Sequence, residues 1–424
     1  MKIALIYSFN ESNWFSCTKI VKNLLSAYDE ALKDDEIVRL NFNDEDENFT
    51  LSGLVSSIIE HNPDKLIFLD HKPHPFNVLK QLFAESPNFS SDIYIHIYGD
   101  FTLLFLNWMA SEKYLKDRKV KFFCASDAQV GLVEKCLTGD CVSKVPFPVD
   151  SSEFFYKSES KDIRDKYGLP KDSKIYLYTG RLSAQKKISE LIEGFDRAIT
   201  NSTIDKNSYL ILAGAFDSIG FSFGGIYEFE GEYYRKWKKT LDSFHPNVQD
   251  KIKFVGMVKN SELVDYYNSS DYFVSLSTYH DEDYGMSVAE AGCCGTPLIL
   301  SDWAGFKSFK FNKTTKVVKT ALGIKEPKLI LESIGDAFSG LVDIEAEQRK
   351  IDSKSFNDYC SVSAVATLLK KELSASLEQF KGFNHFFSTL ARLEGLRIKI
   401  FYDEHEKELN SNYRELYEVY ASDS

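Results

Sequence analysis

The stretch that decides the fold runs from Tyr279 to Pro297 and reads YHDEDYGMSVAEAGCCGTP. A short apolar run precedes it, a glycine marks a turn, and the residues that follow are typical of a short helix that stops at Gly295 and Pro297. Backbone amides at the start of such a helix, over Gly285–Val288, have no partners within the helix and form a site for an anion. The stretch therefore predicts a ligand-binding loop at the end of a strand.

Two carboxylates lie eight residues apart in this stretch, Glu282 in the loop and Glu290 in the helix. At that spacing they can point at the two ends of one ligand that lies across the helix start. A competing interpretation is a capping box, in which Ser287 and Glu290 only tie down the first turn of the helix. A third is a D-x-D metal site at Asp281–Asp283, with a second such triplet at Asp44–Asp46, because hard oxygen ligands suit Mg²⁺ or Mn²⁺.

A second segment, TGRLSAQKK at Thr179–Lys187, supplies cations. A strand runs into Gly180, Arg181 follows it, and Lys186 comes just before an amphipathic helix. A guanidinium can fork onto phosphate oxygens, and an ammonium adds a point charge. The alternative is a solvated basic turn, to which Lys187 also contributes.

Strand-like and helix-like segments alternate along the chain, as in a parallel sheet flanked by helices. A polar linker over residues 150–172 separates two such series, and a largely helical region follows from about residue 327. The second series begins with the strand-like run Lys174–Tyr178 and continues with an amphipathic helix over Ile188–Ile199. The strand-like runs are Lys2–Ser8, Lys65–Asp70, Ile93–Tyr98, Val120–Ser126, Lys174–Tyr178, Tyr209–Ala213, Lys253–Val255, Tyr272–Leu276 and Pro297–Leu300. This pattern predicts two doubly wound α/β domains with a helical tail, and ligands outside the carboxyl ends of the strands, in a cleft between the domains.

Composition excludes several classes of protein. The 424 residues carry 51 cations and 63 anions, a net charge of −12, which argues against a broad basic face for nucleic acid. No apolar run approaches the roughly 18 residues of a membrane span, and the apolar start is too short for a signal peptide. The seven cysteines are odd in number and form no CxxC pair, which fits reduced thiols in the cytoplasm. His71 and His74 form an H-x2-H pair, but no second pair at ligand spacing accompanies it, so we expect no metal.

The chain resembles the retaining nucleotide-sugar glycosyltransferases of the GT-B type, specifically glycosyltransferase family 4 (glycosyl transferases group 1). The resemblance covers most of the chain and rests on several motifs in order. They are VPFPVDSSEF, GLPKDSKIYLYTGRLSAQKK, YLILAGAF, KIKFVGMVKNSELVDYYNSSDYFVSLS and the segment between the two glutamates, which ends in EAGCCGTPLILSD.

The resemblance implies two Rossmann-like domains that face each other across a cleft. The acceptor side would be residues 1–150, the nucleotide-sugar domain residues 151–400, and residues 401–424 a terminal helix that crosses back to the first domain. Tyr413, Leu416 and Tyr417 lie in that last stretch.

The resemblance also assigns roles on the donor side. Arg181 and Lys186 would grip the diphosphate, Glu290 would bind the ribose hydroxyls and Glu282 would contact the donor sugar. The segment Gly256–Val258 would lie beside the nucleobase. The main chain at Tyr284–Ser287 would contact the sugar and the phosphate. The expected donor-binding set is Gly180, Arg181, Lys186, Met257, Val258, Glu282, Tyr284, Gly285, Met286, Ser287 and Glu290.

On the acceptor side the resemblance points to His96, which lies near a strand's end and would contact the transferred sugar. His71 and Asp100 are further acceptor-side candidates. A histidine on a strand can equally be a hydrogen-bonded structural residue. Two departures from the family pattern stand out: the loop Ser8–Trp14 lacks glycines, and Lys187 replaces a glycine, which alters the turn or adds a cation.

The expected activity is a metal-independent, retaining hexosyl transfer from a nucleoside-diphosphate sugar, with UDP or GDP as the favoured carrier, to a hydroxyl of a glycan, lipid-linked sugar or glycosylated protein. The catalytic set would be Glu282, His96, Arg181 and Lys186, with no further cofactor. A sugar-nucleotide epimerase, a non-catalytic subunit of a two-chain transferase and a nucleotide-binding regulator are the alternatives. A cytoplasmic location is expected, with attachment to the inner membrane face and a partner subunit left open.

Overall fold

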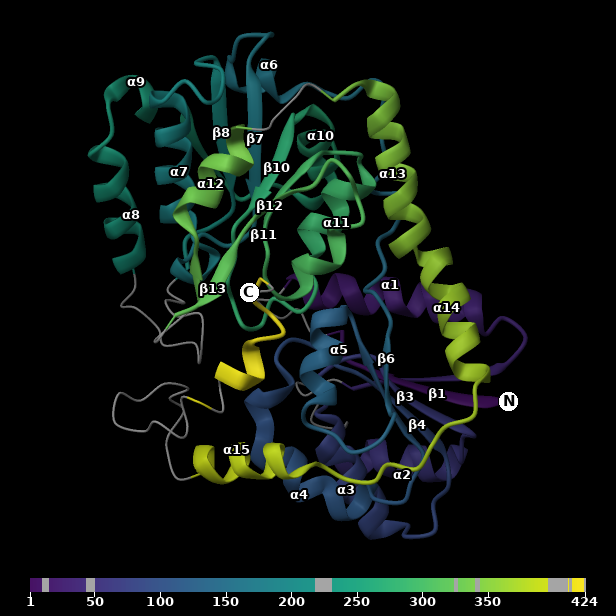
Figure 1. Cartoon of the computed structure of the whole chain (residues 1–424). Helices are drawn as coiled ribbons and strands as arrows, with labels where there is room; N and C mark the ends of the chain where they lie inside the picture. Colours follow the sequence, from purple (N-terminus) through teal and green to yellow (C-terminus); the bar gives the residue numbers. More distant parts are fainter. Residues whose placement is uncertain are drawn as a thin grey trace. The chain divides into compact units, whose positions relative to one another are not determined.

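The computed structural model describes residues 1–9, 15–42, 50–217, 231–323, 327–339, 344–395, 411 and 414–422. The chain forms two compact units, each with its own parallel sheet (Figure 1). Residues Met1–Pro148 and Cys360–Leu416 form the first unit, and Val149–Tyr359 and Tyr417–Ser424 form the second.

The first unit contains a six-stranded sheet in the order β2-β1-β3-β4-β5-β6, and each pair of neighbours is parallel. Its strands are β1 (Lys2–Tyr7), β2 (Glu36–Asn41), β3 (Lys65–Phe68), β4 (Asp92–His96), β5 (Val120–Cys124) and β6 (Val142–Lys144). Its helices are α1 (Phe15–Ala31), α2 (Leu51–His61), α3 (Pro75–Glu85), α4 (Phe105–Leu115), α5 (Asp127–Glu134), α14 (Val362–Ser374) and α15 (His385–Gly395), with a 3-10 helix at Phe101–Leu104. The central strands read as apolar runs because helices cover both faces of a parallel sheet.

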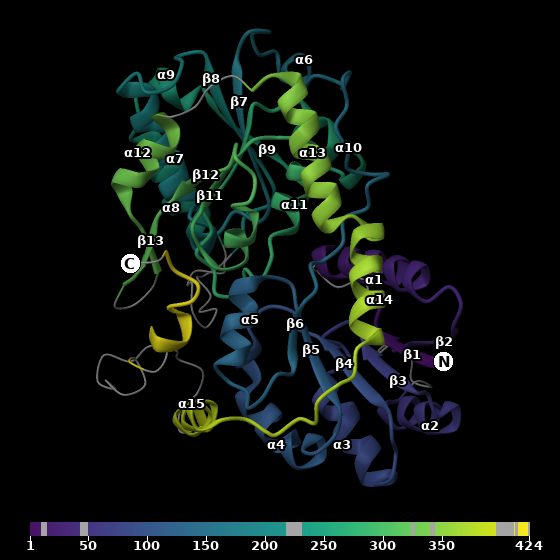
Figure 2. The ribbon, with the colours of Figure 1, turned by 45° about the vertical axis from the view of Figure 1, so that its right-hand side comes forward.

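The second unit contains a six-stranded sheet in the order β12-β11-β10-β7-β8-β9, again parallel throughout. Its strands are β7 (Lys174–Thr179), β8 (Ser208–Ala213), β9 (Ile252–Gly256), β10 (Tyr272–Ser275), β11 (Leu298–Ser301) and β12 (Lys316–Val318), and β13 (Thr320–Leu322) pairs antiparallel with β14 (Pro327–Leu329). The helices are α6 (Ile163–Tyr167), α7 (Ile188–Thr200), α8 (Glu232–Asp242), α9 (Pro246–Gln249), α10 (Asn260–Ser269), α11 (Met286–Cys293), α12 (Leu331–Ser339) and α13 (Ala346–Cys360), with 3-10 helices η2 (Ala184–Lys186) and η3 (Ala304–Phe309). In Figure 2, α7, α8 and α12 cover one face of this sheet and α10 and α11 the other.

The strand order of the second unit reverses between β7 and β10. From β7 the chain builds outward through β8 to β9, then returns to the other side of β7 with β10 and builds outward through β11 to β12. The connection after β7 therefore leads toward one edge of the sheet, and the connection after β10 leads toward the other edge. In open α/β sheets such a switch point, at the carboxyl ends of the strands, is where ligands bind.

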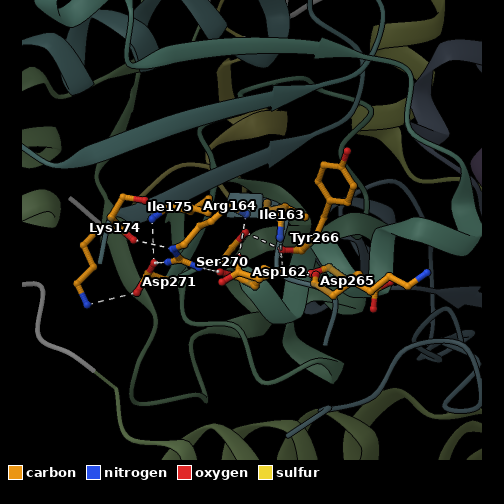
Figure 3. A network of polar contacts seen from close by, with 12 residues as sticks. Asp162, Ile163, Arg164, Lys174, Ile175, Asp265, Tyr266, Ser270 and Asp271 are labelled. Carbon is orange, nitrogen blue, oxygen red and sulfur yellow. Dashed lines mark hydrogen bonds and ion pairs between the residues drawn. The ribbon is translucent and has the colours of Figure 1, made fainter. Parts of the chain in front are cut away.

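A partly buried polar network around Arg164 and Asp271 joins β7 and β10 at their opposite, amino-terminal ends (Figure 3). The Arg164 guanidinium lies 2.6 Å from Asp271 Oδ2 and donates to the carbonyls of Ser173 and Ser269 at 2.9 and 2.8 Å. Asp271 Oδ2 also accepts from the Ile175 amide at 2.8 Å. The two strands that carry the switch point are thus tied together at their other end.

The two doubly wound domains predicted from the alternating pattern are confirmed. The helix expected over Ile188–Ile199 is α7, and each expected strand is present with ends shifted by a few residues. The short strands β2, β6, β12, β13 and β14 were not predicted, and β14 lies at the start of the region from about residue 327 that was expected to be largely helical. The expected linker contains the short helix α6.

The structure groups the C-terminal residues differently from the expected boundaries 151–400 and 401–424. Residues Cys360–Leu416 group with the first unit because α14 packs on α1 and α15 on α4. Tyr417 and the residues after it group with the second unit. Tyr413 lies outside the described residues.

Candidate functional site

The loop after β7 begins with a close contact between two main chains. A Cβ atom on Gly214, which follows β8, would lie 1.8 Å from the carbonyl oxygen of Gly180. Gly180 has a φ of +142° and donates its amide to Ala213 O at 3.0 Å, while the Leu182 amide donates to Ala215 O at 2.8 Å. Glycine is required at such an approach, and the contact places the loops after β7 and β8 side by side.

Arg181 projects from this junction. Its Nη1 lies 2.7 Å from Oδ2 of Asp217, in the loop after β8, and its carbonyl accepts from the Tyr178 hydroxyl at 2.8 Å. Burial lowers the pKa of the Arg181 guanidinium, but the ion pair with Asp217 outweighs it and leaves this pKa raised. The site therefore holds a permanent cation whose direction Asp217 sets.

The residues before α7 hold the two lysines in different environments. Lys187 has a φ of 57° and precedes the first residue of α7. This left-handed conformation is the one that glycine favours, and it occurs at the position where the resemblance led us to expect a glycine. The Lys187 side chain is buried and its Nζ lies 3.5 Å from Glu190 Oε1, so Glu190 already partners this extra cation.

Lys186 meets Glu282 across the switch point. The Lys186 Nζ contacts Glu282 Oε2 in an ion pair, and the two side chains are 15% and 12% exposed. The Lys186 Nζ also lies 5.5 Å from the centre of the Tyr279 ring. This contact joins the loop after β7 to the loop after β10, as expected for residues that face one ligand.

The helix of the deciding stretch begins at Met286, with Gly285 as its N-cap. Gly285 has a φ of +100°, and a Cβ atom there would lie 2.5 Å from the Phe306 ring. Its carbonyl accepts from the amides of Val288 and Ala289 at 3.0 and 3.1 Å. Of the amides expected at this anion site, that of Val288 is therefore engaged within the helix, whereas Met286 and Ser287 precede the helix's own bonds.

The capping-box interpretation of Ser287 and Glu290 is wrong. Because Gly285 is the N-cap, Ser287 is the second residue of the helix and Glu290 lies beyond its first turn. The Glu290 side chain is buried, and its Oε2 accepts from the Tyr267 hydroxyl at 3.1 Å. Tyr267 in turn lies 3.0 Å from Thr179 Oγ1 at the end of β7.

The Tyr267 hydroxyl remains protonated beside this carboxylate. Burial raises the pKa of Tyr267 well above its usual range, and the charge of Glu290 raises it further. Tyr267 thus holds Glu290 at the carboxyl end of β7, on the same edge as Arg181 and Lys186.

The other expected donor-side residues follow neighbouring strands. Met257, 64% exposed, and Val258 come directly after β9. The Tyr284 side chain is fully buried, with its ring centre 5.2 Å from that of Phe309, so only its main chain is available to a ligand. The second unit therefore presents the whole expected set at the carboxyl edge of one sheet.

His96 lies at the end of β4 in the first unit. Its side chain is buried, with Nε2 2.8 Å from the Tyr28 hydroxyl. Burial lowers the pKa of His96 to about 3, so the ring is neutral near pH 7. The structure favours the hydrogen-bonded structural histidine at this position, and contact with a sugar stays a prediction.

The two other acceptor-side candidates have local partners. His71 Nδ1 lies 2.7 Å from Asp70 Oδ1. Asp100 is buried and caps the 3-10 helix at Phe101–Leu104, accepting from the amide and hydroxyl of Thr102 at 2.8 and 2.6 Å. Their roles stay predictions, and residues 10–14 of the glycine-free loop lie outside the described residues.

Neither a metal-binding cluster nor a membrane-spanning helix occurs among the described residues. Within them, no group of three or more His, Cys, Asp or Glu side chains is arranged to hold a metal ion. In the triplet Asp281–Asp283, the central Glu282 instead binds Lys186; the triplet Asp44–Asp46 lies outside the described residues. None of the described helices is long and apolar enough to cross a membrane.

Sequence reasoning missed three side chains that support the site. Asp217 orients Arg181, Tyr267 holds Glu290, and Thr179 contacts the Tyr267 hydroxyl. A polar residue just after a strand was the available signal for Asp217 and Thr179. Nothing in the sequence distinguishes Tyr267 from its neighbour Tyr266.

Comparisons with known proteins agree with this geometry. Residues 159–320 match the family model described as glycosyl transferases group 1. Mannosylfructose-phosphate synthase of Agrobacterium fabrum is 27% identical over 175 residues, which cover 41% of this chain and 35% of that protein. Lipopolysaccharide 1,2-N-acetylglucosaminetransferase of Salmonella typhimurium is 24% identical over 306 residues, covering 72% and 69%. The match to an alpha-monoglucosyldiacylglycerol synthase of Streptococcus pneumoniae, 28% identical, covers 33% of this chain and 26% of that protein. The chain thus spans about a third or less of the first and third of these relatives.

Solved structures match over more of the chain. HepE of Anabaena, in complex with UDP and glucose, has a TM-score of 0.62 at 12% identity and covers 88% of this chain and 99% of its own. Sucrose-phosphate synthase from Thermosynechococcus elongatus has a TM-score of 0.59 at 14% identity and covers 89% and 100%. The chain therefore has the GT-B fold, and its second unit carries a region that matches the glycosyl transferases group 1.

Proposed function

We propose that this chain is a retaining glycosyltransferase that moves a hexose from a nucleoside-diphosphate sugar, UDP- or GDP-linked, to a hydroxyl acceptor. The observation that carries the proposal is the contact of Lys186 with Glu282 across the switch point of the second sheet. Arg181 and Glu290 lie on the same edge of that sheet. Two cations and two acids around one switch point suit a ligand with a charged centre and hydroxyl-bearing ends.

The cations would act on the leaving group. As the bond from the anomeric carbon to the diphosphate breaks, negative charge builds on the phosphate oxygens. Arg181, Lys186 and the first amides of α11 would stabilise that charge, and the loss of one such donor costs roughly 10²–10³ in rate. Because these side chains carry the positive charge themselves, we propose that transfer needs no divalent metal.

The two acids would hold the sugars. Glu290, which already accepts one hydroxyl hydrogen from Tyr267, has the chemistry to accept others from a ribose. Glu282 would contact the donor sugar, and its ion pair with Lys186 makes it a weak nucleophile. We therefore propose attack of the acceptor hydroxyl on the face from which the diphosphate leaves, with the acceptor proton passing to a phosphate oxygen and the anomeric configuration retained.

The acceptor is proposed only as a hydroxyl compound. By name, one relative is a synthase of a sugar phosphate, one is a synthase of a glucosylated diacylglycerol, and one is a lipopolysaccharide N-acetylglucosaminetransferase. A glycan, a lipid-linked sugar and a glycosylated protein are accordingly the classes to test.

The test is a screen of UDP-, GDP-, ADP- and CMP-sugars for thermal protection and for slow hydrolysis, followed by transfer to the three acceptor classes with and without EDTA. One nucleotide sugar should protect and turn over, the product should keep the donor's anomeric configuration, and EDTA should leave the rate unchanged. Arg181→Ala and Lys186→Ala should each lower turnover by about 10²-fold or more.

Lys166→Ala is the matched control, because Lys166 is a half-exposed lysine in α6, remote from the carboxyl edge. It should behave like the unmodified protein. Full turnover in either site variant would refute the donor-site assignment. Epimerisation of the donor without transfer, or protection without any turnover, would refute the transferase.

A further inference from the structure

The last described residues of the chain dock on the second unit. Tyr417 and Tyr420 are fully buried there. Figure 1 shows the yellow C-terminal end beside β13. The amide of Thr320, the first residue of β13, donates to Ser422 Oγ at 2.8 Å, and the Ser422 amide donates back to Thr320 Oγ1 at 3.1 Å. We call Tyr417–Ser422 the tail.

The tail also contacts η3, the 3-10 helix after β11. The Ala304 amide donates to the Tyr420 carbonyl at 2.9 Å, and Lys307 Nζ donates to the Ala421 carbonyl at 2.7 Å. The Tyr420 ring meets the Trp303 ring edge-on, with centres 5.6 Å apart. The tail thus holds η3 through main-chain, charged and aromatic contacts.

The residues next to these contacts support the loop that carries Glu282. The Trp303 indole donates to the Tyr279 carbonyl at 2.7 Å, and the Gly305 amide donates to the Glu282 carbonyl at 2.9 Å. A Cβ atom on Gly305 would lie 2.4 Å from the carbonyl carbon of Asp283, so the two main chains touch. Because side chains that support a site must be locked in place for it to keep its geometry, movement of η3 would move Glu282.

We propose that Tyr420 is a positioning residue of the donor site and that the tail keeps the Glu282 loop in the geometry that binds a nucleoside-diphosphate sugar. This inference rests on the proposed function for its ligand. Its mechanical part, the coupling of the tail to residues 279–285, does not depend on any ligand. The two parts can therefore fail separately.

The first experiment measures amide hydrogen exchange by mass spectrometry in Tyr420→Ala, in a chain that ends at Leu416, and in Tyr420→Phe. In the first two, exchange should accelerate by about tenfold or more in peptides that cover residues 279–289, because the loop loses its support and opens locally. Peptides from β8 and α10 should not change. Tyr420→Phe keeps the ring on Trp303 and should restore slow exchange.

The second experiment measures binding of UDP, UDP-glucose, GDP and GDP-mannose by calorimetry, with kcat and KM for any of them that turns over. Tyr420→Ala should raise the donor Kd or KM by about tenfold and lower kcat, since misplacement of a supporting group by about 1 Å can cost up to 10²-fold. Tyr420→Phe should stay within about twofold of the unmodified protein. Tyr167→Ala, in α6 at the other end of the sheet, is the control for removal of a part-buried tyrosine.

If Tyr420→Ala does not fold, Lys307→Met, which removes two hydrogen bonds to the tail, should give a smaller change of the same kind, and Lys307→Arg should rescue it. Unchanged exchange at 279–289 in these variants, or equal acceleration throughout the second unit, would overturn the inference. If the unmodified protein binds none of the four probes, the donor part of the inference falls with the proposed function while the exchange data still decide the coupling. Donor binding that survives loss of the tail unchanged would overturn the positioning role alone.

Discussion

The ion pair of Lys186 with Glu282 allows stability and activity to be separated experimentally. We expect Lys186→Met to destabilise the second unit because it leaves the carboxylate of Glu282, 12% exposed, without its cation. Removing one partner of a buried pair costs about 3–5 kcal/mol. Since both side chains retain some exposure, we expect the lower end, about 3 kcal/mol. For a unit of roughly 200 residues, that loss lowers Tm by about 6–12 °C.

The double variant Lys186→Met/Glu282→Gln removes the uncompensated charge. It should recover about 2 kcal/mol of that loss, since contacting residues show coupling energies of about 0.5–3 kcal/mol. Turnover should remain lowered by about 10²-fold or more, because the cation that we propose binds the diphosphate is still missing. A double-mutant cycle with urea unfolding, read on the transition of the second unit, measures the coupling. If the two single losses add within about 0.5 kcal/mol, the pair does not couple and the argument is refuted.

Four further predictions address other parts of the chain. Arg164→Met should cost about 3 kcal/mol in urea unfolding of the second unit, the lower end for a buried pair, because Asp271 loses its buried partner but is 23% exposed and keeps Lys174 and the Ile175 amide; Lys166→Met, at a half-exposed pair, should cost less than about 1 kcal/mol. Gly285→Ala should cost more than about 1 kcal/mol and reduce donor hydrolysis, because a side chain is strained at a φ of +100° and meets Phe306; unchanged hydrolysis would contradict this. Lys187→Gly should leave stability within about 1 kcal/mol and turnover intact, since relief of the left-handed strain offsets the lost Glu190 contact and the added chain entropy; loss of turnover would show that Lys187 serves the site. His96 has a pKa of about 3 in the folded state against an ordinary value of 6.5, so between these two pH values the unfolded chain binds a proton that the folded chain does not. The free energy of unfolding of the first unit should therefore fall as pH drops from 6.5 toward 3, by up to about 1.4 kcal/mol per pH unit. His96→Gln should flatten that slope, measured by urea unfolding at a series of pH values.

The alternation of apolar runs was sufficient to predict both sheets, because parallel strands buried on both faces leave a strong signal. The strands that escaped prediction are edge or very short strands. In β2, for example, only Leu40 is buried, and Glu36 and Arg39 interrupt the pattern. An edge strand of this kind is specified by its pairing with β1 rather than by its own residues.

The positions of the residues expected on the donor side could be predicted because each lies in a segment that follows a strand; their roles stay predictions. What the sequence could not supply is the set of partners that come from distant segments. Asp217 reaches Arg181 only because Gly180 and Gly214 let two loops touch, and Tyr267 reaches Glu290 from another helix. The burial of His96 against Tyr28 also depends on packing between a helix and a strand far apart in the chain.

The division of the chain has a consequence for engineering. The backbone passes from one unit to the other three times, after Pro148, Tyr359 and Leu416. A single truncation of the chain therefore cannot isolate either unit. A chimera that exchanges the second unit for that of another protein needs three matched junctions. To express the second unit alone, residue 359 would have to be joined to the tail through an artificial linker. Without that linker the second unit would lose the tail and its contacts to η3.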